Sequence, residues 1–119
     1  MPRMLIVEDE VALNHCLQEF FTEKGFSVVG VFSGEEAVER LNEGEVDLII
    51  LDVLLPGLTG LEVLKHAKTS HPQARVIVVT AVDDKDVHKT ARRYGADAVI
   101  SKPFDFSDST WSCVFAQPT

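Results

Sequence analysis

Three runs of consecutive apolar residues constrain the fold of this chain most strongly. They are Leu5–Val7, Leu48–Leu51 and Val76–Val79. A strand with one face in water alternates apolar and polar residues, whereas a strand covered on both faces is apolar throughout. These runs therefore predict parallel strands with helices packed on both faces of the sheet.

Helical patterns alternate with the predicted strands. We expect strands at 3–7, 27–32, 46–52, 75–80 and 98–101. The apolar positions of the four intervening helices are Leu13, Leu17, Phe20 and Phe21; Ala37, Val38 and Leu41; Leu61, Leu64 and Ala67; and Val87, Ala91 and Tyr94. Strands and helices that alternate through short connections predict a doubly wound, flavodoxin-like α/β fold, with five parallel strands in the order 2-1-3-4-5.

Composition excludes several classes of function. The 119 residues suit a single domain, and no apolar run approaches the ~20 residues that span a bilayer. The N-terminus has no signal-peptide layout, and Cys16 and Cys113 have no metal or redox spacing, so we expect reduced thiols in a cytoplasmic protein. The formal charge of -8 argues against direct nucleic acid binding, and it leaves room for a bound cation.

Polar residues stand where four of the predicted strands end. Glu8 and Asp9 follow the first strand, Asp52 ends the third, Thr80 ends the fourth and Lys102 follows the fifth. Open α/β sheets bind ligands beyond this edge, at the point where the strand order reverses. We therefore expect three carboxylates, a hydroxyl and an ammonium to converge in one crevice.

The chemistry of this group favours a phosphoryl site. Two like charges about 4 Å apart repel by roughly 4 kcal/mol at an effective dielectric of 20, so three acids need a cation or protons. Oxygen ligands favour Mg²⁺, and Mg²⁺ opposite Lys102 is suited to hold a phosphoryl group, with Asp52 as the nucleophile. Taken singly, Asp52 could be a cap or turn residue, Glu8 and Asp9 could begin a helix, Thr80 could be an ordinary β-branched strand residue and Lys102 a surface lysine. These ordinary interpretations would together require four independent coincidences at the ends of strands that meet at one point.

Four motifs closely resemble the receiver domain of bacterial two-component response regulators. They are IVEDE (6–10), LDVLLPGLTG (51–60), VVTA (78–81) and YGADAVISKPF (94–104), within a resemblance that covers residues 3 to about 106. The resemblance implies that Asp52 is the phosphoacceptor. It also implies that Asp9 and Asp52 ligate Mg²⁺ directly, that Glu8 acts mostly through water, and that the backbone carbonyl of Leu54 completes the protein ligands.

The resemblance further implies a signalling switch rather than an enzyme with a released product. Thr80 resembles the switch hydroxyl and Lys102 the phosphate contact, followed by Pro103, often in a cis bond. Pro56-Gly57 and Gly60 shape the loop after the acceptor. A sensor histidine kinase or phosphotransfer protein would supply the phosphoryl group. The surface of the fourth helix, fifth strand and last helix would then change its binding of a downstream effector domain or protein.

Two departures from the family concern the switch. Val99 stands three residues before Lys102, where the family usually has an aromatic residue, so Thr80 must couple to the surface in another way. Leu54 and Val82, two residues beyond Asp52 and Thr80, are apolar and unable to bond an attacking water. We therefore expect slow hydrolysis of the acyl phosphate.

The third departure is the C-terminal segment FDFSDSTWSCVFAQPT (104–119), which is rich in poor helix formers. Phe106, Trp111, Val114 and Phe115 would share an apolar face from a start at Ser107 or Asp108, and we expect a short or irregular last helix. We assign 1–116 to the domain and 117–119 to a loose tail, with no effector domain in this chain. An uncovered apolar face would favour a homodimer or a longer protein.

The alternatives to a signalling switch belong to other classes of protein. A receiver-like interaction module without phosphorylation would keep the fold alone, although all the site residues are present. An aspartate-nucleophile phosphatase generally needs a second acid where Leu54 stands, and a flavin protein would need a phosphate loop where Glu8 and Asp9 stand. Outside the site we expect only solvated or helix-start residues at His15, His66, His71, His88, Asp83, Asp84 and Asp86.

Overall fold

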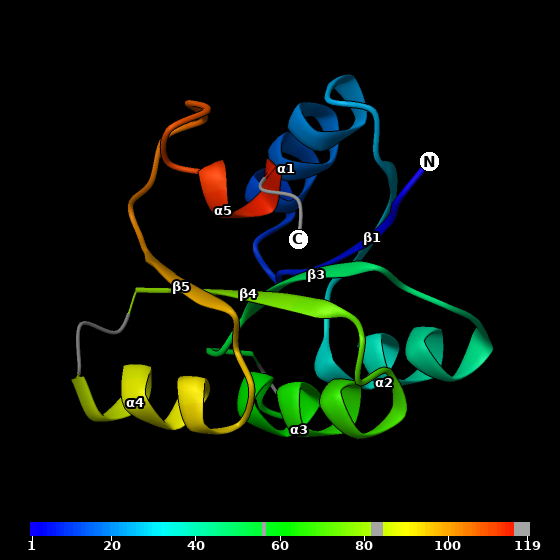
Figure 1. Cartoon of the computed structure of the whole chain (residues 1–119), viewed down its shortest axis with the longest axis vertical. Coiled ribbons are helices and arrows are strands. Elements are labelled where there is room, and N and C mark those ends of the chain that lie inside the picture. The colour runs from blue at the N-terminus through cyan, green and yellow to red at the C-terminus, as the bar shows by residue number, and fades with distance from the viewer. Residues whose placement is uncertain (56, 82–84, 116–119) are drawn as a thin grey trace.

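The apolar runs lie in one sheet of five parallel strands, in a computed structural model that describes residues 1–55, 57–81 and 85–115. The strand order is β2-β1-β3-β4-β5, as predicted from the sequence (Figure 1). The strands are β1 (Arg3–Val7), β2 (Ser27–Val31), β3 (Leu48–Asp52), β4 (Arg75–Thr80) and β5 (Ala98–Ser101).

Helices cover both faces of the sheet. Helices α1 (Val11–Glu23) and α5 (Ser112–Phe115) lie on one face, and α2 (Gly34–Glu43), α3 (Gly60–Ser70) and α4 (Lys85–Arg93) lie on the other (Figure 1). No helix in the described ranges is long and apolar enough to cross a membrane.

Each continuous apolar strand supplies two hydrophobic cores. Leu5 and Val7 of β1 pack against the α2–α4 side, whereas Met4 and Ile6 pack against the α1 and α5 side. Strand β3 divides in the same way, and all five of its residues are buried. This alternation explains why these strands have no polar face.

Two boundaries differ from the sequence-based expectation. Strand β2 ends one residue early, at Val31, and β3 begins at Leu48 rather than at residue 46. Leu48 pairs with Met4 on one side and with Arg75, the first residue of β4, on the other. Asp47, just before β3, still bonds both neighbours through its backbone, donating to Arg3 O at 2.9 Å and accepting from the Arg75 amide at 3.0 Å.

Helix α3 turns a slightly different face to the sheet than the sequence predicted. Val63, Leu64 and Ala67 are fully buried, and Leu61 is only partly buried. Gly60 permits the close approach of this helix to β3, because a Cβ atom there would lie 2.3 Å from the carbonyl oxygen of Asp52. The close approach fixes the first turn of the helix against the end of β3.

The last helix is short, as predicted, although it begins at Ser112 rather than at Ser107 or Asp108. The Asp105 carboxylate accepts hydrogen bonds from the Ser107 amide at 3.1 Å, the Ser107 hydroxyl at 2.7 Å and the Thr110 hydroxyl at 2.6 Å. These bonds hold the pKa of Asp105 below its usual value. They also form a side-chain turn in place of the first helical turn.

Trp111 and Val114 attach this segment to the sheet. Both are buried in the core on the α1 side, while Phe106 remains 39% exposed. The guanidinium group of Arg75, at the start of β4, donates hydrogen bonds to the carbonyl oxygens of Cys113 and Val114. The protein's own core thus covers most of the apolar face that the sequence left without a partner. The predicted loose tail, 117–119, lies outside the described residues.

Candidate functional site

Three carboxylates meet at the carboxyl ends of β1 and β3. Val7 pairs with Leu51, so the residues that follow each of them, Glu8 and Asp52, are brought side by side. One carboxylate oxygen from each of Glu8, Asp9 and Asp52 lies within 4.8 Å of the others. Glu8 and Asp52 are only 1% and 3% exposed, whereas Asp9 is exposed to solvent.

Lys102 joins the two buried acids. Its Nζ lies 2.6 Å from Glu8 Oε1 and 2.8 Å from Asp52 Oδ2, and its side chain is only 17% exposed. The Lys102 amide donates to the carbonyl oxygen of Thr80 at 2.8 Å, which fixes the lysine at the end of β5. The peptide bond to Pro103 is cis, as the resemblance implied. The sequence predicted that Lys102 and the acids lie in one crevice, but it did not predict the direct contacts of Lys102 with Glu8 and Asp52.

Backbone amides orient the same two carboxylates. The Leu54 amide donates to Asp52 Oδ1 at 2.8 Å, and the Glu10 amide donates to Glu8 Oε2 at 3.0 Å. Each buried carboxylate therefore places one oxygen on Lys102 and the other on a backbone N–H group. Both are held in position before any ligand arrives.

Burial and charge shift two pKa values in this group. Burial raises the pKa of Glu8 from 4.5 to about 7, despite the opposing hydrogen bond from Lys102. Burial would lower the pKa of Lys102, but its hydrogen bonds to Asp52 and Glu8 outweigh burial and raise it. Three clustered carboxylates face the single ammonium of Lys102, so a divalent cation held by oxygen ligands suits this site. The donor set fits Mg²⁺.

The raised pKa of Glu8 predicts a pH dependence of stability in the absence of divalent cations. The unfolded carboxyl titrates near 4.5 and the folded one near 7, so the folded protein binds the extra proton between these values. Its stabilising effect is complete below pH 4.5 and is lost as the pH rises through 7. We expect the free energy of unfolding in EDTA to fall by about 2 kcal/mol between pH 5 and pH 8.

Urea denaturation at each pH measures this effect, with Glu8→Gln as the matched control. The fall should be smaller in Glu8→Gln by about 2 kcal/mol, because that side chain does not titrate. An equal fall in both proteins would show that Glu8 has an ordinary pKa.

The other predicted site residues differ in burial, and some lie outside the described residues. Thr80 ends β4 and is buried, one residue beyond Val79, the strand partner of Asp52. Val99 is partly buried and packs into the core on the α2–α4 side. Leu54 is 54% exposed beside Asp52, as an apolar group at the mouth of the site. Val82, Pro56 and the acids Asp83 and Asp84 lie outside the described residues.

The loop after Asp52 is held by helix α2. Glu35 Oε1 accepts a hydrogen bond from the Leu58 amide at 2.6 Å. Sequence reasoning did not find this contact, nor the buried Asn14, whose side chain bonds the carbonyl oxygen of Glu8. A signal for Asn14 existed, since it lies on the apolar stripe three residues before Leu17.

His71 and His66 make polar contacts that were not expected. His71 Nε2 lies 2.6 Å from the carbonyl oxygen of Leu41, and His66 Nε2 lies 3.2 Å from Asn42 Oδ1. Both contacts join α3, or the residue after it, to the end of α2. They serve packing between these helices and lie away from the acids.

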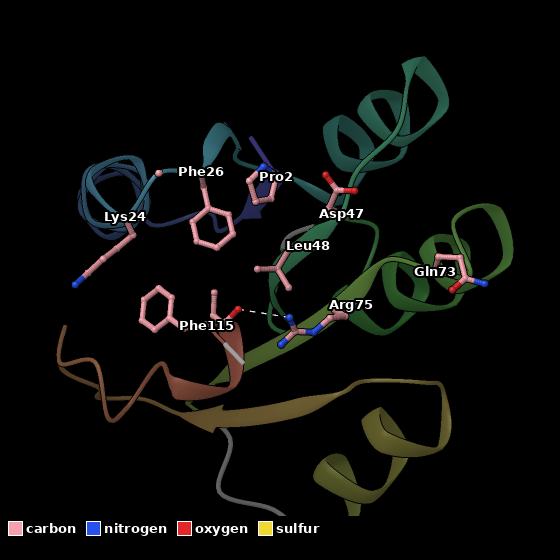
Figure 2. A pocket seen from close by; sticks show the side chains of 10 residues that line it. Pro2, Lys24, Phe26, Asp47, Leu48, Gln73, Arg75 and Phe115 are labelled. Atoms are coloured by element: carbon pink, nitrogen blue, oxygen red, sulfur yellow. Dashed lines mark hydrogen bonds between the residues drawn. The ribbon is translucent and has the colours of Figure 1, made fainter. Parts of the chain in front are cut away.

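A separate cavity of about 420 Å³ lies at the opposite end of the strands (Figure 2). Leu48 and Arg75, which begin β3 and β4, line it together with Lys24, Phe26 and Phe115. The carboxylates lie at the other ends of the same strands. This cavity is therefore no part of the candidate site.

Comparison with known proteins gives the family. Residues 4–110 match the response regulator receiver domain family. The chain is 31% identical over 106 residues to sporulation initiation phosphotransferase F of Bacillus subtilis, covering 89% of this chain and 86% of that protein. It is 41% identical over 100 residues to a cyclic di-GMP phosphodiesterase of Thermotoga maritima, covering 84% of this chain but only 27% of that protein.

Solved structures agree with this assignment. The response regulator protein TrrA from Thermotoga maritima, in complex with Mg²⁺ and BeF, is 30% identical with a TM-score of 0.84, covering 97% of this chain and 98% of that one. CheY in a CheX-CheY-BeF3-Mg complex from Borrelia burgdorferi is 29% identical with a TM-score of 0.88, covering 98% and 90%. Receiver domains act in general as phosphorylation-dependent signalling switches rather than as enzymes. By its sequence match, its strand order and its cluster of acids, this chain belongs to the response regulator receiver domain family.

Proposed function

We propose that this chain is a signalling switch in which Asp52 accepts a phosphoryl group. The observation that carries the proposal is the contact of Lys102 with both Glu8 and Asp52, at 2.6 and 2.8 Å. A buried carboxylate beside a fixed ammonium and two further acids has the groups that phosphoryl transfer requires, namely a nucleophile, a phosphate contact and a cation site.

Each residue has a defined task in the proposed site. Asp9, Asp52 and the carbonyl of Leu54 would ligate Mg²⁺, and Glu8 would act mostly through water. The bound ion would neutralise charge on the phosphoryl oxygens. Lys102 would contact the same oxygens from the opposite side, turning from the carboxylates toward the new phosphate.

The transfer step is a displacement at phosphorus. An oxygen of Asp52 forms the new bond to phosphorus, and the bond from phosphorus to a donor's imidazole nitrogen breaks. The donor is a sensor histidine kinase or a phosphotransfer protein. The similarity to a protein named a phosphotransferase, of which the chain covers 86%, supports phosphoryl transfer as the class of reaction.

The output is a change in partner binding. The new phosphoryl oxygens would draw the Thr80 hydroxyl inward, and the chain after Thr80 leads into α4. We place the changed surface on α4, β5 and α5, of which residues 112–115 of α5 are described. The matches to parts of longer proteins, such as 46% of the uncharacterized transcriptional regulatory protein YkoG of Bacillus subtilis, support a downstream effector domain or protein as the recipient.

Fluoroberyllate with Mg²⁺, which mimics a phosphoryl group on a carboxylate, tests the switch. Amide shifts in an NMR titration should change at Thr80, Ala81 and along β5, and little at Lys24 and Gly25 at the far end of α1. Asp52→Asn should show none of these changes. A wild-type protein that is folded but unresponsive would favour the receiver-like interaction module without phosphorylation.

Leu54→Asn should shorten the lifetime of the phosphorylated protein. Leu54 is exposed beside Asp52, and its apolar side chain offers no hydrogen bond to an attacking water. An amide there orients that water, and a single positioned hydrogen bond of about 1.4 kcal/mol in the transition state would accelerate hydrolysis about tenfold. The phosphoprotein's decay after removal of the donor measures this, with Leu54→Met as the apolar control. Equal or slower decay in Leu54→Asn would contradict the prediction.

A further inference from the structure

Asn14 is a fully buried polar side chain on the inner face of α1, next to the acids but not one of them. Its Nδ2 donates to the carbonyl oxygen of Glu8 at 2.9 Å and to that of Val31 at 2.8 Å. Its Oδ1 accepts from Gln18 Nε2 at 2.7 Å. Both amide hydrogens of Asn14 thus bind carbonyl groups at the carboxyl ends of neighbouring strands.

The orientation of this amide is fixed by its surroundings. If Oδ1 and Nδ2 were exchanged, an oxygen would face two carbonyl oxygens, and the Gln18 amide would face a second donor. The Glu8 amide also donates to the Val31 carbonyl, at 3.2 Å, so Asn14 adds a second link between the same two strand ends. The position requires a carboxamide rather than a carboxylate or an apolar group.

Strand β2 leaves room for this arrangement at Gly30. A Cβ atom on Gly30 would lie 2.4 Å from Asn14 Oδ1 and 2.2 Å from Gln18 Nε2. Gln18 is only part-buried and can move aside, whereas Asn14 is tied to two carbonyl groups. The glycine is therefore a second, independent feature of the sequence that fits the placement of Asn14.

We infer that Asn14 is a positioning residue for the cation site, because it fixes the turn between β1 and α1 on which Glu8 and Asp9 stand. The inference rests on the proposed function, in which these acids hold Mg²⁺. Partners that fix metal ligands typically change metal affinity by 10–100-fold when they are removed. We expect the Mg²⁺ dissociation constant of Asn14→Leu to rise about tenfold, since leucine has the same branching but donates to neither carbonyl group.

Isothermal titration with Mg²⁺ alone measures this effect, and two controls separate positioning from general loss of stability. Leu17→Ala removes buried contacts from the same helix but touches neither carbonyl, and Gln18→Met removes the bond to Oδ1 only. Both should bind Mg²⁺ within about twofold of the parent. Gly30→Ala, which displaces Asn14 without replacing it, should weaken binding severalfold.

A second readout needs no metal. In EDTA, the Glu10 amide, which donates to Glu8 Oε2, should exchange with solvent about tenfold faster in Asn14→Leu than in Gln18→Met. If Asn14→Leu is too unstable to measure, Gly30→Ala tests the role of Asn14 through both the Mg²⁺ affinity and the exchange rate of the Glu10 amide.

The outcomes separate the two ideas. Unchanged Mg²⁺ affinity in Asn14→Leu or Gly30→Ala, or an equal loss in Leu17→Ala, would overturn the role of Asn14 and leave the proposed function intact. A folded wild-type protein that binds no Mg²⁺ at millimolar concentrations would overturn the cation site itself.

Discussion

Lys102→Met is expected to lose about 3 kcal/mol of unfolding free energy in EDTA and to regain most of it in Mg²⁺. Lys102 is the cation that contacts both buried acids in the described part of the chain. Removing one partner of a buried ion pair typically costs 3–5 kcal/mol, because the remaining charge is left uncompensated. Glu8 can take up a proton, so we place the loss at the lower end. Mg²⁺ restores positive charge beside the same oxygens.

Urea denaturation followed by circular dichroism, with and without Mg²⁺, measures both parts of this prediction. Arg40→Met is the matched control, because the Arg40–Glu43 pair is exposed on α2 and should contribute less than about 1 kcal/mol. A loss in Lys102→Met that Mg²⁺ does not relieve would mean that the lysine stabilises the fold by another route.

Trp111→Ala is expected to lower the free energy of unfolding by about 3–5 kcal/mol. Trp111 is fully buried, and its ring makes edge-to-face contacts with Phe21 and Phe104 at 5.3 and 5.0 Å between centroids. Its Nε1 donates to the carbonyl oxygen of Asp105 at 2.8 Å. This buried side chain therefore anchors the C-terminal segment to the core on the α1 side.

The matched control is Phe106→Ala, an aromatic residue of the same segment that is 39% exposed. Its truncation should cost about 1 kcal/mol, as expected for a side chain that remains partly in water. Thermal or urea denaturation by circular dichroism compares the two without relying on tryptophan fluorescence. Equal losses in both variants would contradict the anchoring role of Trp111.

The sheet and the convergence of the acids were predictable from the sequence because both follow from topology. Apolar runs such as Leu48–Leu51 serve two cores at once, which only strands covered on both faces do. Once the order is 2-1-3-4-5, the ends of β1 and β3 are neighbours, and Glu8 and Asp52 must meet.

The remaining features depend on atomic contacts that residue patterns do not encode. The close approach of α3 to the backbone of Asp52, which Gly60 permits, is one such contact. The start of α5 depends on the hydrogen bonds that the Asp105 carboxylate accepts from the Ser107 and Thr110 hydroxyl groups. These side-chain bonds compete with backbone helix formation, and helix propensity alone does not predict which of the two prevails. The role of Asn14 becomes visible only when its two carbonyl partners are placed in space.

Intact-protein mass spectrometry after incubation with acetyl phosphate, with and without Mg²⁺, tests the central claim most directly. The account predicts a single phosphoryl adduct on the wild-type protein that requires Mg²⁺ and is absent from Asp52→Asn. A folded wild-type protein that forms no adduct, or an adduct that persists in Asp52→Asn, would contradict the assignment of Asp52 as the acceptor.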